Sequence, residues 1–352
     1  MKTLRIAYVL RTFPKLSETF IVGELAELHR RGVELRILSQ LPPREAMRHR
    51  LVAEAGLDEL VSYEPDRFED EIRDFRPHLL HAHFATEPTE QARELAAASG
   101  LPFTFTTHGY DIYRKAPADI ADRAAAAAAI VTVSDANRAF MDASLGIPAD
   151  RVTVIPCGID LDVFRPNGRP TAPLVVCVAR LNPAKSLEIL LDACALLRDR
   201  GVDFLCVVVG EGRCREELEQ RHREHGLDGI VDLVGAAPQH EVLAWWQRAS
   251  IAALSSAREG APVCLMEAAA CGVPAVAPAV GGVAELIEHG STGFVTRPGD
   301  PEGLAEALER LLTDAVLRER LGVAARRRAE ERFSVALQVD RLLEVWDGAL
   351  HA

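Results

Sequence analysis

The sequence lacks any long hydrophobic run that could anchor it in a bilayer. No stretch of its 352 residues approaches 18 consecutive apolar residues, so no segment is predicted to span a membrane. The opening residues, MKTLRIAYVLRTF, lack the long apolar region and small-residue cleavage site of a signal peptide. We therefore expect a cytoplasmic protein, and contact with the cytosolic face of a membrane stays open.

Paired cysteines are also missing. The seven cysteines are scattered singly, with no Cys-x-x-Cys pair among them. An odd number of cysteines in mostly apolar contexts is typical of reduced thiols in the core of a cytosolic protein.

Positive charge is scarce over the chain as a whole. Forty Lys and Arg face 52 Asp and Glu, which gives a net charge of -12, so a general nucleic-acid binder is not expected. The first fifty residues are the exception, with ten basic against five acidic residues. The cluster of Arg44, Arg48, His49 and Arg50 could contact an anionic acceptor or a lipid surface, or could be a solvated helix face.

The order of predicted elements indicates two α/β domains in tandem. The length favours about two domains, and short β-branched runs alternate with longer helical patterns. We predict an N-terminal Rossmann-like domain over 1–165, a C-terminal one over 166–333, and a last helix over 334–352 that packs back on the first domain. Doubly wound sheets bind ligands beyond the carboxyl ends of their strands, so both domains are expected to face a central cleft.

One apolar segment keeps two acids with no nearby cation. Between Arg258 and Arg297 there is no Lys or Arg, yet Glu259 and Glu267 lie in this part of the chain. Pro262 suits the first position of a helix, and Gly272 suits the position after its end, so a helix is predicted over 262–271 with Glu267 in its second turn.

This segment combines two kinds of binding group. The free amides at the helix start, around Ala261, Val263 and Cys264, suit a phosphate. Carboxylates accept hydrogen bonds from the vicinal hydroxyls of a sugar. Phosphate and hydroxyls together describe a nucleotide sugar.

The motifs then resemble those of a known family. Two glutamates separated by seven residues and followed by CGVPAVAPAVGGVAELIEHGSTGFV resemble retaining glycosyltransferase family 4, of GT-B fold. VARLNPAKSLEILLDA, VVVGEG and IPCGIDLDVFRP match further motifs of that family, so the resemblance covers almost the whole chain. YVLRTFPKLSETFI, HAHFATEP and FTFTTHGYDIY resemble the branch that builds bacterial exopolysaccharides of the colanic-acid type, with some antibiotic-pathway transferases close to it.

The resemblance implies roles for individual residues. Glu259 would bind hydroxyls of the transferred sugar and Glu267 those of the ribose, whereas Arg180 and Lys185 would neutralise the diphosphate. His108 would reach the donor sugar from the first domain. The remaining donor-binding candidates are Gly210, Gly212, Gly260, Ala261, Pro262, Val263 and Cys264.

The chain departs from the family pattern at two places. Ser186 replaces the glycine after the motif lysine, and the Gly-Gly pair of the first loop is replaced by FPKLSETF. Backbone contacts from that loop to phosphate are therefore in doubt. The acceptor-side candidates are Lys15, Ser17, Glu18, His81, His83 and Asp111.

No metal or cofactor is expected. His81 and His83 share one face of a strand, a geometry that suits a metal, but no third ligand is evident, and lining of the cleft or packing stay open. Asp160 and Asp162 resemble a metal-binding triplet of the other glycosyltransferase fold but lie in a linker segment. GEGRCREE lacks the third glycine of a dinucleotide fingerprint.

The sequence predicts a retaining, metal-independent transfer of a hexosyl group from a nucleotide-diphosphate sugar to a hydroxyl of a glycan, a lipid-linked sugar or a natural product. No convincing nucleophile is present, so the implied route is front-face substitution. The alternatives are a GT-B phosphorylase, a nucleotide-sugar epimerase, or a non-catalytic nucleotide-sugar-binding protein.

Overall fold

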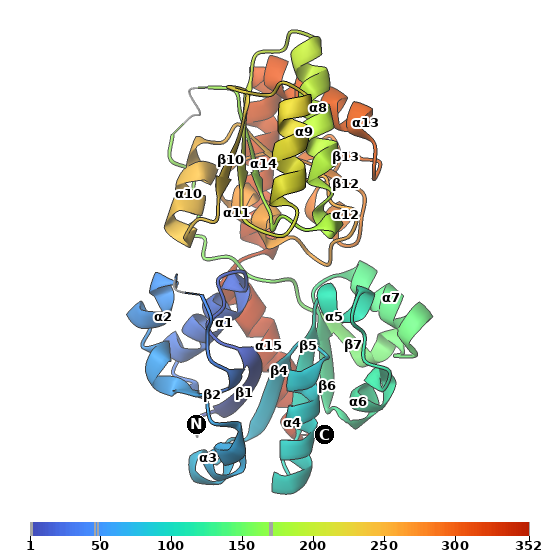
Figure 1. The fold of residues 1–352 in the computed structure, drawn as a ribbon. Helices are drawn as coiled ribbons and strands as arrows, with labels where there is room; N and C mark the ends of the chain where they lie inside the picture. The colour runs from blue at the N-terminus through green and yellow to red at the C-terminus, as the bar shows by residue number, and fades with distance from the viewer. Residues whose placement is uncertain (1–2, 46, 48, 169–171, 352) are drawn as a thin grey trace. The chain divides into compact units, whose positions relative to one another are not determined.

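The chain forms two compact units. The computed structural model describes residues 3–45, 47, 49–168 and 172–351 (Figure 1). The first unit runs to Gly158 and resumes at Val335, and the second is Ile159–Ser334. The chain leaves the first unit earlier than the predicted boundary after residue 165. Ile159 already belongs to the second unit, where its amide donates to the carbonyl of Phe333 at 2.7 Å.

The first unit is built on a seven-stranded parallel sheet with strand order β3-β2-β1-β4-β5-β6-β7. Its strands are β1 (Arg5–Thr12), β2 (Glu34–Leu41), β3 (Val61–Ser62), β4 (Leu79–His83), β5 (Phe103–Thr107), β6 (Ala129–Thr132) and β7 (Val152–Val154). Side chains alternate between the two faces of a strand. In β1, Ala7 and Val9 enter one apolar cluster, whereas Ile6, Tyr8 and Leu10 enter the other.

Helices cover both faces of this sheet, α4 packing against α3 and α6, and α1 against α2 and α15. They are α1 (Thr19–Arg30), α2 (Arg50–Glu54), α3 (Phe68–Phe75), α4 (Glu87–Ser99), α5 (Tyr110–Tyr113), α6 (Ile120–Ala126), α7 (Asp135–Leu145) and α15 (Val335–His351).

The last helix belongs to the first unit although it follows the second in sequence. Val339, Leu342 and Trp346 of α15 are buried in the same apolar cluster as Tyr8. The chain passes closely over this helix at Gly158, where an added Cβ would lie 2.3 Å from the Cα of Val335. Only glycine fits at this crossing point.

The second unit is built on a six-stranded parallel sheet with strand order β10-β9-β8-β11-β12-β13. Its strands are β8 (Leu174–Val178), β9 (Leu205–Val209), β10 (Val231–Gly235), β11 (Ile251–Ala253), β12 (Ala275–Pro278) and β13 (Gly293–Thr296). Both sheets are doubly wound. The strand order reverses beside the first strand of each sheet, β1 or β8, so the connections that follow the two neighbouring central strands run in opposite directions.

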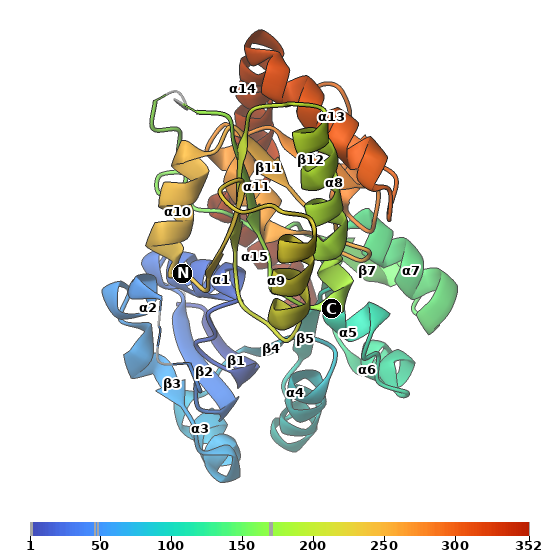
Figure 2. The ribbon, with the colours of Figure 1, turned by 45° about the horizontal axis from the view of Figure 1, so that its top comes forward.

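Two groups of helices pack on this sheet. Helix α8 packs against α9 and α13, and α11 packs against α10 and α14 (Figure 2). The helices are α8 (Leu187–Asp199), α9 (Arg215–Glu224), α10 (Gln239–Arg248), α11 (Val263–Ala270), α12 (Val283–Leu286), α13 (Pro301–Thr313) and α14 (Ala315–Arg332).

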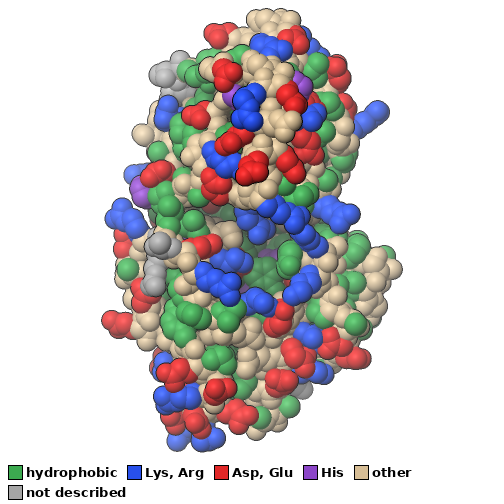
Figure 3. All heavy atoms as spheres, viewed as in Figure 1, with side chains coloured by type: hydrophobic (Ala, Val, Ile, Leu, Met, Phe, Trp, Pro, Cys, Tyr) green, Lys and Arg blue, Asp and Glu red, His purple; other side chains and the backbone are tan. Residues whose placement is uncertain are grey.

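No helix in the described ranges combines the length and the apolar character that a bilayer span requires. On the face drawn in Figure 3, hydrophobic side chains occur in small groups between charged ones. The larger apolar side chains lie in the interior, where Trp246, Trp346, Tyr8 and Phe13 are among the largest that are fully buried.

Candidate active site

Glu259 is paired with a cation from a distant part of the sequence. It follows β11, and Lys185 ends a short 3-10 turn after β8; Nζ of Lys185 lies 2.5 Å from Oε1 of Glu259. The hydroxyl of Ser256 donates to the same oxygen at 2.6 Å. Burial lowers the pKa of Lys185, but the charge of Glu259, the neighbouring Cys264 and the hydrogen bond to Glu259 together hold that pKa above its usual value, with Arg180 acting in the opposite sense. The Lys185 ammonium is therefore charged at a site that is largely closed to water.

The two loops that carry this pair are also joined through the backbone. The amide of Ala257 donates to the carbonyl of Ala184 at 2.9 Å, and the hydroxyl of Ser255 donates to the carbonyl of Lys185 at 3.1 Å. The ion pair is thus held by loops that are fixed to one another.

Glu267 has a different environment, although it lies in the same segment. It is 5% exposed within α11, and Nε1 of Trp246 donates to its Oε2 at 3.2 Å. Burial raises the pKa of Glu267 to about 7, against the lowering effect of the Trp246 hydrogen bond. No ion pair to Glu267 occurs among the described residues. Its carboxyl group therefore titrates near neutral pH.

Two predicted glycines let the loops after β8 and β9 touch. Gly210 has φ of +146°, and a Cβ there would lie 1.9 Å from the carbonyl oxygen of Ala179. A Cβ at Gly212 would lie 2.2 Å from the carbonyl oxygen of Leu181. These contacts place the β9 turn against the loop that carries the exposed Arg180.

The helix after Glu259 begins one residue later than predicted. Pro262 has φ of -70° and ψ of 105°, so it is the N-cap, and α11 starts at Val263. The extended ψ of Pro262 keeps it out of the first turn, contrary to the assignment to the first helical position. Within the described residues, the backbone amides of Val263 and Cys264 have no hydrogen-bond acceptor.

The glycines around this helix start also have a structural use. The amide of Gly282 donates to the carbonyl of Gly260 at 2.8 Å, and a Cβ at Gly281 would lie 1.7 Å from the carbonyl oxygen of Glu259. Ala261, between the acid and the helix, is half-buried. Burial raises the pKa of Cys264 far above its usual value, so its thiol stays protonated.

In the first unit, two predicted histidines meet. His83 ends β4, His108 follows β5, and Nδ1 of His83 lies 3.1 Å from Nε2 of His108. On its other side, Nε2 of His83 lies 3.0 Å from Oε1 of Glu24 in α1. Burial, with His83 as a second cause, holds the pKa of His108 well below its usual value, so its imidazole is neutral near pH 7.

His81 does not fit the predicted acceptor-side role. It is fully buried, with Nδ1 2.8 Å from the hydroxyl of Thr104 and Nε2 3.1 Å from that of Thr106. Burial holds the pKa of His81 well below its usual value, with His83 and His108 as lesser causes. Both ring nitrogens are used inside the fold, so the packing interpretation holds for His81.

A metal is the other interpretation that the sequence leaves open for these histidines. One ligand atom each from Glu24, His81 and His83 lie within 4.8 Å of one another, a spacing that could hold an ion. Each of these atoms already has a protein partner, the Tyr8 hydroxyl among them at 2.6 Å from Oε1 of Glu24. A metal is therefore not needed to satisfy this cluster. Asp160 likewise uses its carboxylate to accept from the amide of Asp162 at 2.9 Å.

Asp111 stabilises the loop that carries His108 through hydrogen bonds to backbone amides. It is fully buried and accepts from the backbone amides of His108 and Ala85, both at 2.8 Å. Burial raises the pKa of Asp111 to about 7, although these hydrogen bonds act in the lowering direction. Both oxygens are used by the backbone, so the structure gives Asp111 a positioning role where acceptor contact was predicted.

The loop that replaces the Gly-Gly pair is pinned by an ion pair. Nζ of Lys15 lies 2.5 Å from Oε1 of Glu18, and the amide of Leu16 donates to Glu45 at 2.7 Å. Ser17 is exposed. The three candidates Lys15, Ser17 and Glu18 thus lie on one turn, two of them already paired.

The predicted basic cluster is not a single exposed set. Arg44 and Arg50 are exposed, and Arg50 pairs with Glu54 at 3.1 Å. His49 is 4% exposed, and burial lowers its pKa. Arg48 lies outside the described residues.

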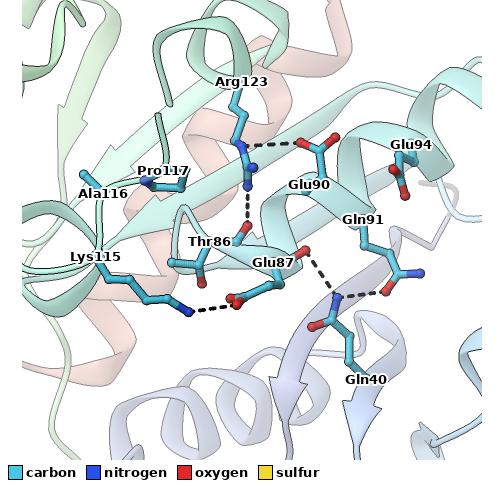
Figure 4. A pocket seen from close by; sticks show the side chains of 10 residues that line it. All are labelled: Gln40, Thr86, Glu87, Glu90, Gln91, Glu94, Lys115, Ala116, Pro117 and Arg123. Atoms are coloured by element: carbon cyan, nitrogen blue, oxygen red, sulfur yellow. Dashed lines mark hydrogen bonds and ion pairs between the residues drawn. The ribbon is translucent and has the colours of Figure 1, made fainter. Parts of the chain in front are cut away.

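A pocket of about 480 Å³ opens on the first unit (Figure 4). It is lined by Gln40, Thr86, Glu87, Glu90, Gln91, Glu94, Lys115, Ala116, Pro117 and Arg123. Lys115 pairs with Glu87 at 2.9 Å, and Gln40 donates to Gln91 at 2.8 Å. The polar side chains of the pocket mainly satisfy one another, and none of them was predicted from the sequence.

Comparison with family models covers nearly the whole chain. Residues 17–163 match the model of Glycosyltransferase Family 4, and residues 160–328 match that of Glycosyl transferases group 1. The amylovoran biosynthesis glycosyltransferase AmsK of Erwinia amylovora is 31% identical over 281 residues, 76% of this chain and 69% of AmsK. This chain belongs to glycosyltransferase family 4.

Another relative of this family 4 glycosyltransferase is the putative colanic acid biosynthesis glycosyltransferase WcaL of Escherichia coli K12. The two are 34% identical over 173 residues, 47% of this chain and 43% of WcaL. The chain thus matches about two thirds of AmsK but less than half of WcaL.

Solved structures show the GT-B fold. The crystal structure of Anabaena Alr3699/HepE in complex with UDP-glucose superposes with a TM-score of 0.83 at 20% identity, over 98% of this chain and 99% of that one. The predicted fold class, with two parallel Rossmann-like sheets, is therefore confirmed.

Sequence reasoning on this family 4 glycosyltransferase missed several residues that contact the predicted ones within each unit. Ser256 donates to Glu259, and Trp246 donates to Glu267. Glu24 contacts His83, and Gln338 donates to Glu24. Glu24 carried a weak signal, because it is an acid within the apolar run FIVGELAEL. Trp246 and Gln338 carried none, because their partners lie far away in sequence, and Ser256, three residues before Glu259, is an ordinary loop residue.

Proposed function

We propose that this chain is a retaining glycosyltransferase that moves a hexosyl group from a nucleoside-diphosphate sugar to a hydroxyl of a glycan, a lipid-linked sugar or a natural product. The observation that carries the proposal is the buried ion pair between Lys185 and Glu259, 2.5 Å apart. It lies in a loop that leads directly into a helix start with free amides.

The groups at this site suit both halves of a nucleotide sugar. Lys185 and Arg180 supply positive charge for a pyrophosphate, and the amides of Val263 and Cys264 add donors at a helix N-terminus. Glu259 can accept hydrogen bonds from sugar hydroxyls, and Glu267 from those of the ribose. The structurally similar HepE was solved in complex with UDP-glucose, which makes UDP-sugars the first donors to test.

The pairing of Lys185 with Glu259 gives the buried acid a cationic partner before the donor arrives. When a pyrophosphate competes for Nζ of Lys185, Oε1 of Glu259 becomes free to accept from the transferred sugar. The same lysine thus prepares the acid and then receives the phosphate.

The proposed chemistry needs no metal. Lys185 and Arg180 act on the negative charge that grows on the departing diphosphate, where fixed cations lower the barrier most. Both glutamates are occupied with hydroxyls, so no enzyme nucleophile is invoked. The leaving diphosphate oxygen takes the proton of the acceptor hydroxyl, and the new bond forms on the face that the leaving group vacates.

The proposal is tested by thermal unfolding with UDP-, GDP-, ADP- and dTDP-sugars, because a ligand that binds the folded state raises its apparent stability. We expect one of these classes to raise the melting temperature, in the presence of a metal chelator as well as without it. The corresponding nucleoside monophosphate, which lacks the pyrophosphate, is the matched control and should have a smaller effect. If no nucleotide sugar stabilises the protein, the proposed donor site is wrong.

A further inference from the structure

A chain of hydrogen bonds runs from the last helix to His108 through the interior of the first unit. Nε2 of Gln338 donates to Oε2 of Glu24 at 2.6 Å, and Oε1 of Glu24 lies 3.0 Å from Nε2 of His83. Nδ1 of His83 then lies 3.1 Å from Nε2 of His108. Glu24 and His83 are each 1% exposed, so water does not interrupt the chain.

The chemistry of the groups fixes where the protons lie. A carboxylate only accepts hydrogen bonds, so the proton of His83 is on Nε2, facing Glu24. In neutral His83 the other nitrogen, Nδ1, is then an acceptor. His108 must therefore carry its proton on Nε2, and its Nδ1 keeps a lone pair.

Three donors hold Glu24 without requiring a second charge beside it. Tyr8 donates to Oε1 at 2.6 Å, the oxygen that also faces His83, and Gln338 donates to Oε2. Because these donors share the charge of the carboxylate, it does not need an imidazolium partner.

On this basis we propose that Glu24 and His83 are positioning residues that set the tautomer of His108, so that Nδ1 of His108 is left to accept a hydrogen bond from a substrate hydroxyl. No described group hydrogen-bonds this nitrogen. The inference rests on the proposed function for its ligand, and on the hydrogen-bond chain alone for its tautomer.

The other titratable groups around the chain are neutral or occupied. Burial raises the pKa of Tyr8, and raises that of Cys157 to about 12. Burial also keeps His81 neutral. Asp111 faces the backbone amide of His108 rather than its ring. Glu24 is therefore the acidic group in direct contact with the His83 ring.

The acid is held in turn by the segment where the chain leaves the first unit. Oε1 of Gln338 accepts from the amide of Gly158 at 2.7 Å. Gln338 therefore has a fixed orientation, with its amide nitrogen toward Glu24. Because the orientation of this amide is fixed, the hydrogen-bond directions along Gln338, Glu24 and His83 depend on which of these residues is charged.

The direct test is nitrogen NMR of protein labelled with ¹⁵N-histidine near neutral pH, with His108→Asn and His83→Asn variants to identify the signals. We expect His108 to be protonated at Nε2 and bare at Nδ1, and His83 to be protonated at Nε2 only. A proton on Nδ1 of His108, or a doubly protonated His83, would overturn the proposal.

A pair of variants tests the role of the chain. In Glu24→Gln, the new amide nitrogen at position 24 faces the amide nitrogen of Gln338, so two donors meet. If the Gln338 amide turns over, its nitrogen faces the backbone amide of Gly158 instead, and two donors meet there. We expect a lower melting temperature and a mixture of His108 tautomers. The double variant Glu24→Gln with Gln338→Glu restores every hydrogen bond. The carboxylate introduced at position 338 accepts from the amide of Gly158 and from the amide nitrogen introduced at position 24, while the amide oxygen at position 24 still accepts from His83.

We expect the double variant to recover both the melting temperature and the single tautomer. If it recovers stability but not the tautomer, or if Glu24→Gln alone already shows the wild-type tautomer, the positioning role is wrong. These spectra need no substrate. If no nucleotide sugar stabilises the protein but the histidine spectra are as expected, only the proposed function is rejected. If a nucleotide sugar does stabilise the protein but the spectra differ from expectation, only this inference is rejected.

Discussion

At the scale of single residues, the two acids of the second unit are stabilised in different ways. Oε1 of Glu259 pairs with Nζ of Lys185 at 2.5 Å, whereas burial raises the pKa of Glu267 to about 7. Two carboxyl groups eight positions apart therefore have different environments, one beside a cation and the other beside the Trp246 indole. The difference is a consequence of their neighbours rather than of their own sequence context.

Glu259→Gln should lower turnover at least about 100-fold, because the amide cannot replace a carboxylate that accepts hydrogen bonds from the sugar. Affinity for the free nucleoside diphosphate should stay the same or rise, because the change removes the carboxylate that competes for Lys185. Steady-state kinetics and a binding titration measure the two effects. Glu302→Gln, which removes an exposed ion pair to Arg200, is the matched control. Near-normal turnover in Glu259→Gln would remove this residue from the mechanism.

Glu267→Gln should change the dependence of stability on pH. The folded pKa of about 7 lies above the ordinary value of 4.5, so the folded state holds its proton more tightly, and stability falls as pH rises through this window. The variant cannot ionise and avoids that loss. Its melting temperature should exceed that of the wild type by about 2 °C or more at pH 8. At pH 5 this advantage should be absent, and an equal difference at both pH values would contradict the raised pKa.

The sequence indicated which acids matter but not how they are neutralised. Lys185 was predicted to bind the diphosphate, and its contact with Glu259 could not be read from a separation of 74 residues. In the same way, HAHF showed two histidines on one face of a strand. It could not show that Thr104 and Thr106 hydrogen-bond to His81, or that His108 hydrogen-bonds to His83.

At the scale of elements, the alternation of strands and helices was predictable wherever the elements are long and buried. The segment between β2 and β4 contains short elements, since β3 has two residues and α2 has five. Such short elements form only through packing and carry little periodic signal. Boundaries are equally hard to read from the pattern: α12 ends at Leu286 although the helical pattern continues beyond it, and α6 ends within an Ala-rich run at Ala126, with β6 starting at Ala129.

Gly210→Ala tests the close approach of the loops after β8 and β9. Its φ of +146° is unfavourable for alanine, and the new Cβ would lie 1.9 Å from the carbonyl oxygen of Ala179. We expect a loss of stability of about 2 kcal/mol or more, together with weaker nucleotide binding. Gly348→Ala, in a helix with open space around it, is the control and should be neutral or slightly stabilising. Equal effects of the two changes in chemical denaturation would contradict the proposed contact.

At the scale of the whole molecule, the chain returns to its first unit through α15. The sequence predicted that the last helix packs back, but not that Gln338 would reach Glu24. That contact depends on the close crossing at Gly158. The last helix thus completes both the core and the polar interior of the first unit.

Trp346→Ala should destabilise the first unit from the far end of the chain. Trp346 is fully buried in the cluster that includes Tyr8, and removal of a buried Trp side chain costs about 3–5 kcal/mol. Hydrogen exchange should become faster in α1 and β1, while β8 and β9 keep their protection. Val316→Ala, at a position that is 80% exposed, should leave both units unchanged. Faster exchange in β8 and β9 instead would show that α15 supports the second unit.

The central claim is that Lys185 binds the pyrophosphate of a nucleotide sugar. The most direct measurement is a calorimetric titration of the nucleotide sugar that stabilises the wild type into the wild type, Lys185→Ala and Lys115→Ala. Lys115 also forms an ion pair with a glutamate, at 2.9 Å, but lies in the first unit and has no assigned role in donor binding. The account predicts that Lys115→Ala binds like the wild type and that Lys185→Ala loses at least about tenfold in affinity. Equal affinity in all three proteins would contradict it.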